Sequence, residues 1–360
     1  MSATMTPTFE GDFTFAETEP FALDSGATLS PVTLRYAQYG TMSATRNNVI
    51  LVCHALSGSA RVADWWGDLF GAGQPFDPSR YCILGINVIG SCYGSTGPTS
   101  VKPATGRRYG GDFPVISIRD MVRAQAKLLD HVGVDRLHAV VGGSIGGMQA
   151  LAWAVDFPER VPRAIVVGAA PLGAMGLAMS HLQRRAIRLD PAWRGGSYEP
   201  DAPPTEGLAL ARAIATCTYK SQDLFHKRFE RKPNRTGARP AVSHDGRFDV
   251  AGYLDHQGST FISRFDANSY LVLTRAQDTF HLGDDPKAQA EILARAKAKV
   301  LLVGIARDWL FPPEDVKLLA ERFRAAGVDA TYAEIETDHG HDGFLAHPEL
   351  LGPMIAKALA

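Results

Sequence analysis

One serine stands on a turn where the chain leaves almost no room for side chains. In Gly142-Gly143-Ser144-Ile145-Gly146, a β-branched run precedes the serine and good helix-forming residues follow it. The sequence therefore predicts a sharp strand-to-helix turn, where glycines two positions before and after the serine avoid a clash. Such a turn presents a nucleophilic hydroxyl. The alternative is a glycine-rich phosphate-binding loop, but the stretch lacks the Lys-Ser/Thr ending of such a loop.

A serine hydroxyl is a weak nucleophile at neutral pH, so it needs a general base and a carboxylate that orients the base. In enzymes with this serine turn, the acid and then the histidine follow the serine along the chain. Asp308 follows one late β-like run, and His341 follows the next. His339 is a second candidate for the base. We favour His341 because the residues after it begin the final helix, which puts it at the rim of the predicted sheet. The alternative for Asp308 is an ordinary loop aspartate.

Backbone amides near the serine would stabilise the oxyanion that forms when the hydroxyl attacks a carbonyl carbon. Ile145 follows the serine and supplies the first amide. The second amide should come from the loop after an early strand, and the loop at 53–58, CHALSG, fits that place. We expect Leu56 to supply it through its backbone N–H. His54 is expected to pack this loop and to take no part in catalysis.

Elements that alternate along the chain must position these residues. Short apolar runs are each followed by a segment of helical character, which favours parallel strands connected by helices. Residues 116–133 carry apolar side chains at helical spacing and end at a glycine, which predicts one of these helices. The expected strands span residues 48–53, 80–87, 137–141, 163–167, 299–303 and 330–335.

The alternation of strands and helices stops between residues 171 and 281, where the sequence is helical and charged. We interpret residues 171–281 as a helical lid inserted into an α/β core that comprises residues 1–170 and 282–360. A lid above the serine would exclude water from the reaction. The predicted fold class is therefore α/β, with a mostly parallel sheet flanked by helices and an inserted helical lid.

Composition argues against several classes of partner. The 360 residues include 37 Lys and Arg and 38 Asp and Glu, and a net charge of −1 argues against binding to nucleic acid or a membrane surface. No apolar run approaches the roughly 18 residues needed to cross a bilayer, and the first residues lack the pattern of a signal peptide. The four cysteines are widely spaced, unlike those of a metal site or a disulfide framework. We expect a cytoplasmic protein without a bound metal.

Several longer motifs together are similar to those of the homoserine O-acyltransferase family, which has the α/β-hydrolase fold and acts in methionine biosynthesis. The resemblance implies transfer of an acetyl group from acetyl-CoA to L-homoserine through an acyl-serine, without a cofactor. It also implies a homodimer formed through lid helices. By the matching motifs, Ser144 resembles the nucleophile, Asp308 the acid and His341 the base. The motifs include HALSG at 54–58, VVGGSIGGMQALAW at 140–153, RFDANSYLVLTRAQD at 264–278, RDWLFPP at 307–313 and HGHDGFL at 339–345.

The resemblance also implies how the amino-acid acceptor is held. Asp342 resembles the carboxylate that binds the ammonium group of homoserine, and Arg212 in the lid resembles the arginine that binds its carboxylate. Tyr219, seven residues after Arg212, would lie two turns away on the same helix face. A zwitterion needs one anion and one cation placed apart, and a guanidinium suits a carboxylate. The alternatives are a solvated helix arginine and an acid that stabilises a helix start.

Other functions stay open at this point. On the same fold, succinyl-CoA could be the donor or L-serine the acceptor, because one methylene is worth only about 1–3 kcal/mol in a pocket. A plain esterase or lipase is a more remote alternative, and it has no need for both Arg212 and Asp342. A non-catalytic binding protein is a further alternative, but the serine, the acid and the histidine are all present in the required order.

Overall fold

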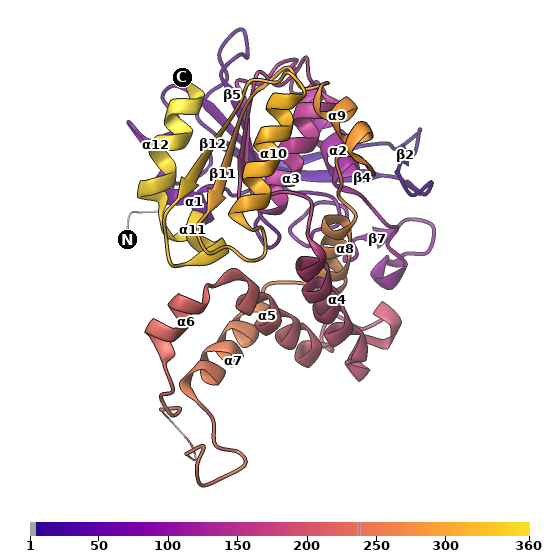
Figure 1. Ribbon diagram of the computed structural model, residues 1–360. Helices are drawn as coiled ribbons and strands as arrows, with labels where there is room; N and C mark the ends of the chain where they lie inside the picture. Colours follow the sequence, from indigo (N-terminus) through magenta and orange to yellow (C-terminus); the bar gives the residue numbers. More distant parts are fainter. Residues whose placement is uncertain (1–4, 236, 238) are drawn as a thin grey trace.

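The computed structural model describes residues 5–235, 237 and 239–360, and an eight-stranded sheet forms its centre (Figure 1). The strands lie in the order β1 (Phe9–Phe15), β4 (Val32–Tyr39), β6 (Cys82–Ile86), β5 (Val49–Cys53), β9 (Ala139–Gly143), β10 (Arg163–Val167), β11 (Lys299–Ile305) and β12 (Ala330–Ile335). From β6 to β12 every neighbouring pair is parallel. The predicted fold class, a mostly parallel sheet flanked by helices, is confirmed.

The two strands at one edge of the sheet were not expected from the sequence. β1 pairs antiparallel with β4, and β4 pairs antiparallel with β6. β1 is only partly buried, and its apolar residues alternate with polar ones and a glycine. Because polar residues interrupt both β1 and β4, neither strand carries the continuous apolar run that revealed the six inner ones.

Each inner strand contributes to two hydrophobic cores, one on each face of the sheet. In β9, Val140 belongs to the core under α2 (Ile118–His131) and α3 (Ile145–Asp156), and Val141 belongs to the core under α12 (Pro348–Leu359). This division follows from the period of two in a strand. The helix expected at 116–133 is α2, where the Ser117 hydroxyl accepts from the Asp120 amide in a capping box. The sheet is therefore fixed on both faces.

Helices follow one another between β10 and β11. They are α4 (Ala174–Leu189), α5 (Thr205–Tyr219), α6 (Gln222–Phe229), α7 (Asp249–Ile262), α8 (Ala267–Asp278) and α9 (Pro286–Leu293). Helices α4 to α8 fall within residues 171–281, the segment predicted as a lid. Helices α4 to α7 gather on one side of the sheet, and α8 lies between them and the core (Figure 1). Within the described residues, no helix combines the length and apolar character that a membrane span requires.

Candidate active site

Ser144 occupies a strained turn between β9 and α3. Its backbone has φ +58° and ψ −127°, a conformation that residues other than glycine rarely adopt. The glycines on either side are required by space. A β carbon at Gly142 would lie 2.1 Å from the carbonyl oxygen of Gly146, and one at Gly146 would lie 2.2 Å from that of Cys53. The turn therefore holds the serine at the carboxyl end of β9, and it needs glycine at positions 142 and 146.

The three residues predicted to act together lie in one hydrogen-bonded chain. The Ser144 hydroxyl donates to His341 Nε2 at 2.9 Å, and His341 Nδ1 donates to Asp308 Oδ2 at 2.7 Å. All three residues are buried, at 7% exposure or less. The second oxygen of Asp308 accepts from the amides of Leu310 at 2.9 Å and Phe311 at 3.0 Å, which fixes the plane of the carboxylate. This arrangement can move a proton from a serine hydroxyl to an imidazole.

The electrostatic surroundings of His341 favour its protonated form. Burial alone lowers the pKa of His341, but the charge and hydrogen bond of Asp308, together with the charge of Asp342, raise it above its ordinary value. His339 lies elsewhere: its Nδ1 is 2.9 Å from Nε2 of His347 and 3.3 Å from the Thr337 hydroxyl. In the part of the chain that the structure describes, His341 is the histidine that contacts Ser144.

The loop that carries Leu56 is anchored by the buried His54. The amide of Val88 donates to His54 Nε2 at 3.1 Å, so Nδ1 carries the proton and donates to the carbonyl of Ala55 at 2.8 Å. Burial lowers the pKa of His54 to about 4, which keeps this ring neutral at neutral pH. Among the described residues, no acceptor engages the amides of Leu56 and Ile145. Both amides are therefore available, and their oxyanion role stays a prediction.

Tyr219 of the lid lies beside the histidine, and Arg212 lies beside Tyr219. The Tyr219 ring lies 5.9 Å from the His341 ring, measured between centroids. The Arg212 guanidinium carbon lies 5.3 Å from the Tyr219 centroid and 4.8 Å from that of Phe261. Burial raises the pKa of the Tyr219 phenol, so it stays neutral at neutral pH. Within the described residues, Arg212 forms no ion pair with an acidic side chain, so its charge is available to a ligand.

Asp342 has a partner that the sequence did not suggest. Its Oδ2 lies 2.6 Å from Nζ of Lys220, the residue directly after Tyr219 in the lid. In the sequence, the only sign that Lys220 could belong to the site was its position next to Tyr219. Lys220 and Asp342 are far apart in the chain, so no local pattern pairs them. Among the described residues, no group of three or more His, Cys, Asp or Glu side chains is arranged to hold a metal ion. The chemistry that these side chains offer is that of serine, imidazole and ion pairs.

Comparisons with known proteins agree with this geometry. The family model of the alpha/beta hydrolase fold matches residues 48–348. The chain is 46% identical to the homoserine O-acetyltransferase of Bradyrhizobium diazoefficiens, over 92% of this chain and 86% of that protein. It is 43% identical to that of Caulobacter vibrioides, over 99% and 96%.

Two solved structures resemble the whole chain. Homoserine O-acetyltransferase from Bacillus anthracis has a TM-score of 0.90 and 28% identity, covering 99% of this chain and 98% of its own. Esterase E22 has a TM-score of 0.89 and 27% identity, covering 98% of this chain and 100% of its own. The fold is therefore shared by a transferase and a hydrolase.

Proposed function

The chain belongs to the homoserine O-acetyltransferase family of α/β-hydrolase-fold enzymes, and we propose that it transfers an acetyl group from acetyl-CoA to the hydroxyl of L-homoserine. The observation that carries the proposal is the hydrogen-bonded chain of Ser144, His341 and Asp308 beside the lid residues Tyr219 and Arg212. The reaction is proposed to serve methionine biosynthesis, as the resemblance implies. The cytoplasmic location is proposed on the widely spaced cysteines and the absence of a signal-peptide pattern in the first residues.

In the first proposed step the enzyme becomes acylated. His341 accepts the proton of the Ser144 hydroxyl, and Oγ attacks the thioester carbonyl carbon of acetyl-CoA. The amides of Leu56 and Ile145 donate to the oxyanion. The carbon–sulfur bond then breaks, and the CoA sulfur leaves with the proton that His341 held. Asp308 keeps the imidazole oriented and stabilises its positive charge. This step requires no metal and no bound cofactor.

In the second proposed step the acceptor takes the acetyl group. The L-homoserine hydroxyl gives its proton to His341 and attacks the acyl-serine, and the proton then returns to Ser144 as the ester bond to the enzyme breaks. Arg212 binds the acceptor carboxylate and Asp342 its ammonium group, with Tyr219 between them. The lid limits access of water, so that the amino-acid hydroxyl competes successfully with hydrolysis.

Steady-state kinetics test the two-step order. A covalent acyl-enzyme with CoA release before acceptor binding gives parallel lines in double-reciprocal plots at several fixed acceptor concentrations. Intact-protein mass spectrometry after mixing with acetyl-CoA alone should show an added acetyl group at Ser144. Intersecting lines with no modified serine would refute this mechanism.

A matrix assay tests the two substrates. Acetyl-CoA and succinyl-CoA are each combined with L-homoserine and L-serine, and free CoA is followed. We expect the highest kcat/KM for acetyl-CoA with L-homoserine. A higher value for succinyl-CoA or for L-serine would replace that half of the proposal and leave the acyl-serine chemistry in place, because the choice depends on contacts worth about 1–3 kcal/mol.

Hydrolysis is a second candidate, because esterase E22 matches the whole chain nearly as well as the Bacillus anthracis transferase. The unpaired guanidinium of Arg212 beside Tyr219, within the described residues, favours transfer to a carboxylate-bearing acceptor. With acetyl-CoA and no amino acid, we expect a single burst of CoA followed by slow turnover. Steady release of CoA at a rate that L-homoserine does not increase would favour the hydrolase.

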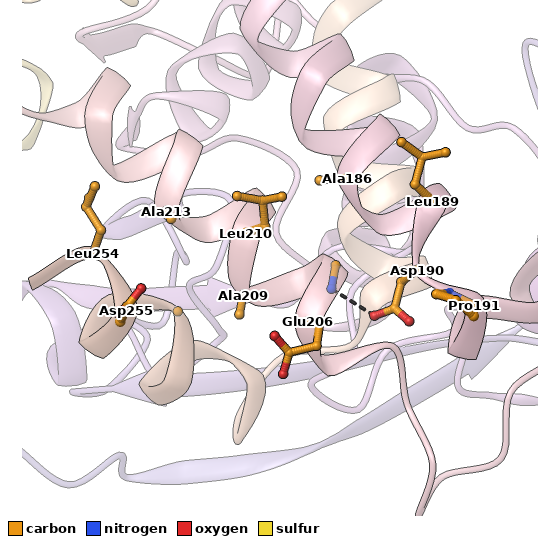
Figure 2. A pocket seen from close by; sticks show the side chains of 12 residues that line it. Ala186, Leu189, Asp190, Pro191, Glu206, Ala209, Leu210, Ala213, Leu254 and Asp255 are labelled. Carbon is orange, nitrogen blue, oxygen red and sulfur yellow. Dashed lines mark hydrogen bonds between the residues drawn. The ribbon is translucent and has the colours of Figure 1, made fainter. Parts of the chain in front are cut away.

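The family resemblance implies a homodimer, and we propose that it forms through the outer face of α4, α5 and α7. Leu189 and Leu210 are 67% and 55% exposed on this face, and exposed apolar clusters favour association. Light scattering after gel filtration should give a dimer for the wild type and a monomer for the double variant Leu189→Glu, Leu210→Glu. The groove between these helices is lined by residues that include Ala186, Leu189, Leu210, Ala213 and Leu254 (Figure 2).

A further inference from the structure

The ion pair between the lid and the histidine loop points to a residue that acts through Asp342. We propose that Lys220 is a positioning residue, which holds the Asp342 carboxylate where the acceptor's ammonium group binds and thereby determines the affinity for the acceptor. The inference deepens the proposed function and rests on it. No part of the family resemblance or of the reaction steps above assigns a role to Lys220.

The contact between the two charges is short and directional. Lys220 Nζ lies 2.6 Å from Asp342 Oδ2, and the two side chains are 17% and 25% exposed. Such a pair is screened less than one in open solvent. In the described part of the chain, no donor engages Asp342 Oδ1. One oxygen is therefore held by the protein while the other can accept a bond from a ligand ammonium group.

The backbone of Lys220 is also fixed to the catalytic loops. The Trp309 indole N–H donates to the carbonyl oxygen of Lys220 at 3.3 Å, and Trp309 directly follows Asp308. The hydroxyl of Ser221 donates to the carbonyl of Asp338. The chain around Lys220 also packs closely on Gly340. A β carbon at position 340 would lie 2.9 Å from the Ser221 amide nitrogen. The ammonium group of Lys220 is thus carried on a segment that lies directly against the His341 loop.

The charges explain why the free enzyme would need this cation. Asp342 is the second carboxylate beside His341, whose Nδ1 already donates to Asp308. A partly buried carboxylate without a counter-ion is unfavourable, because desolvation is not compensated. Lys220 supplies that counter-ion from the lid before the acceptor arrives. Because it engages only Oδ2, the acceptor can bind without displacing it, and the carboxylate is already oriented when it does.

The main test is the variant Lys220→Met, which keeps an unbranched side chain only one atom shorter and removes its charge. We expect the KM for L-homoserine to rise about tenfold, with kcat within about twofold and an unchanged burst of CoA from acetyl-CoA alone. Lys220→Arg should restore most of the affinity, because it keeps a cation at this place. If Lys220 had a purely structural role, Lys220→Met would instead lower the burst rate and the Tm. Lys220→Arg would then not restore the KM selectively.

A matched control comes from a second lid lysine that pairs with the same loop. Lys227 Nζ lies 2.6 Å from Asp338 Oδ2, but this lysine is 67% exposed and its partner is four residues before Asp342. Lys227→Met removes an ion pair of similar length without touching the carboxylate that faces His341. Its KM for L-homoserine should equal that of the wild type.

A double-mutant comparison tests whether Lys220 acts through Asp342. In an Asp342→Asn background, Lys220→Met should raise the KM by no more than about twofold, because the carboxylate it positions is gone. Two results would overturn the inference, provided that the wild type transfers acetyl to L-homoserine. One is an unchanged or lower KM in the single variant Lys220→Met. The other is a full tenfold rise in KM when Lys220→Met is added to Asp342→Asn. A wild type that only hydrolyses acetyl-CoA overturns the proposed function, and this inference with it.

Discussion

The core and the lid hold their functional side chains in different ways. In the core, Ser144, His341 and Asp308 are joined by hydrogen bonds of 2.9 and 2.7 Å and are almost fully buried. In the lid, the Tyr219 ring lies 5.9 Å from the His341 ring, and the Arg212 guanidinium carbon lies 5.3 Å from the Tyr219 ring. These are ring contacts and not hydrogen bonds. The core therefore aligns its three side chains through hydrogen bonds, whereas the lid presents a cation and a ring that we expect a substrate to contact.

The physical origin of the difference lies in what each region packs against. The three core residues follow β9, β11 and β12, which are parallel strands whose carboxyl ends share one edge of the sheet. Backbone hydrogen bonds of the sheet therefore set their spacing. The lid helices have no such common frame, so their side chains reach the site through ion pairs and ring contacts. The variants below separate the two regions, starting with the largest effect.

Removing the serine hydroxyl tests the core directly. Ser144→Ala should lower the rate of acetyl transfer at least about 10³-fold, because it removes the hydroxyl that is proposed to form the acyl-enzyme. The measurement is CoA release with both substrates present, together with circular dichroism to check folding. The variant keeps Gly142 and Gly146, which the strained turn requires, so we expect a folded protein. Transfer above about a tenth of the wild-type rate in a folded variant would remove the nucleophile assignment.

Removing the lid guanidinium should affect the acceptor alone. Arg212→Ala is expected to lower kcat/KM for L-homoserine by about 10- to 100-fold, since a charge-assisted bond to the acceptor carboxylate is lost. The burst of CoA with acetyl-CoA alone should keep its wild-type rate. If the burst slows as much as the overall reaction, Arg212 serves the acylation step and the division between core and lid is wrong.

Adding a single methyl group tests how tightly the serine turn is packed. Gly146→Ala should destabilise the fold by about 1–3 kcal/mol, because its β carbon would lie 2.2 Å from a backbone oxygen that cannot move aside. Gly67→Ala is the matched control: Gly67 has helical φ of −54° and open space around its missing β carbon. Urea unfolding should place the control within about 0.5 kcal/mol of the wild type. Equal stability of both variants would contradict the packing argument.

The smallest expected effect is a shift in the pH dependence of acylation. The base must be neutral, so activity falls as the pH drops through the pKa of His341, which Asp308 and Asp342 hold above its ordinary value. The acid limb of the burst rate should therefore lie at a higher pH in the wild type than an ordinary histidine would give. Asp342→Asn removes one negative charge and should move this limb to lower pH.

A control for the pH experiment is Asp338→Asn, whose carboxylate pairs with Lys227 and is not among the groups that raise the pKa of His341. Its acid limb should coincide with that of the wild type. A limb in Asp342→Asn that stays in place, or moves to higher pH, would show that Asp342 does not act on the imidazole.

Much of the core was predictable because its signals are local. The glycines around Ser144 are required by steric contacts within a stretch of five residues. The inner strands are continuous apolar runs because both of their faces are buried. The order of serine, acid and histidine then narrowed the choice to Asp308 and His341. The edge strand β1 and its neighbour β4 escaped prediction, because polar residues interrupt both and neither carries such a run.

The sequence by itself determined the serine turn, the parallel sheet and the kind of chemistry, because backbone strain and burial constrain residue types at neighbouring positions. Only the tertiary structure decided that Lys220 pairs with Asp342 and that Arg212 lies between the rings of Tyr219 and Phe261. A long charged side chain fits many surroundings equally well. Its partner is chosen by how a helix inserted between two strands meets a loop more than a hundred residues away, which no local pattern encodes.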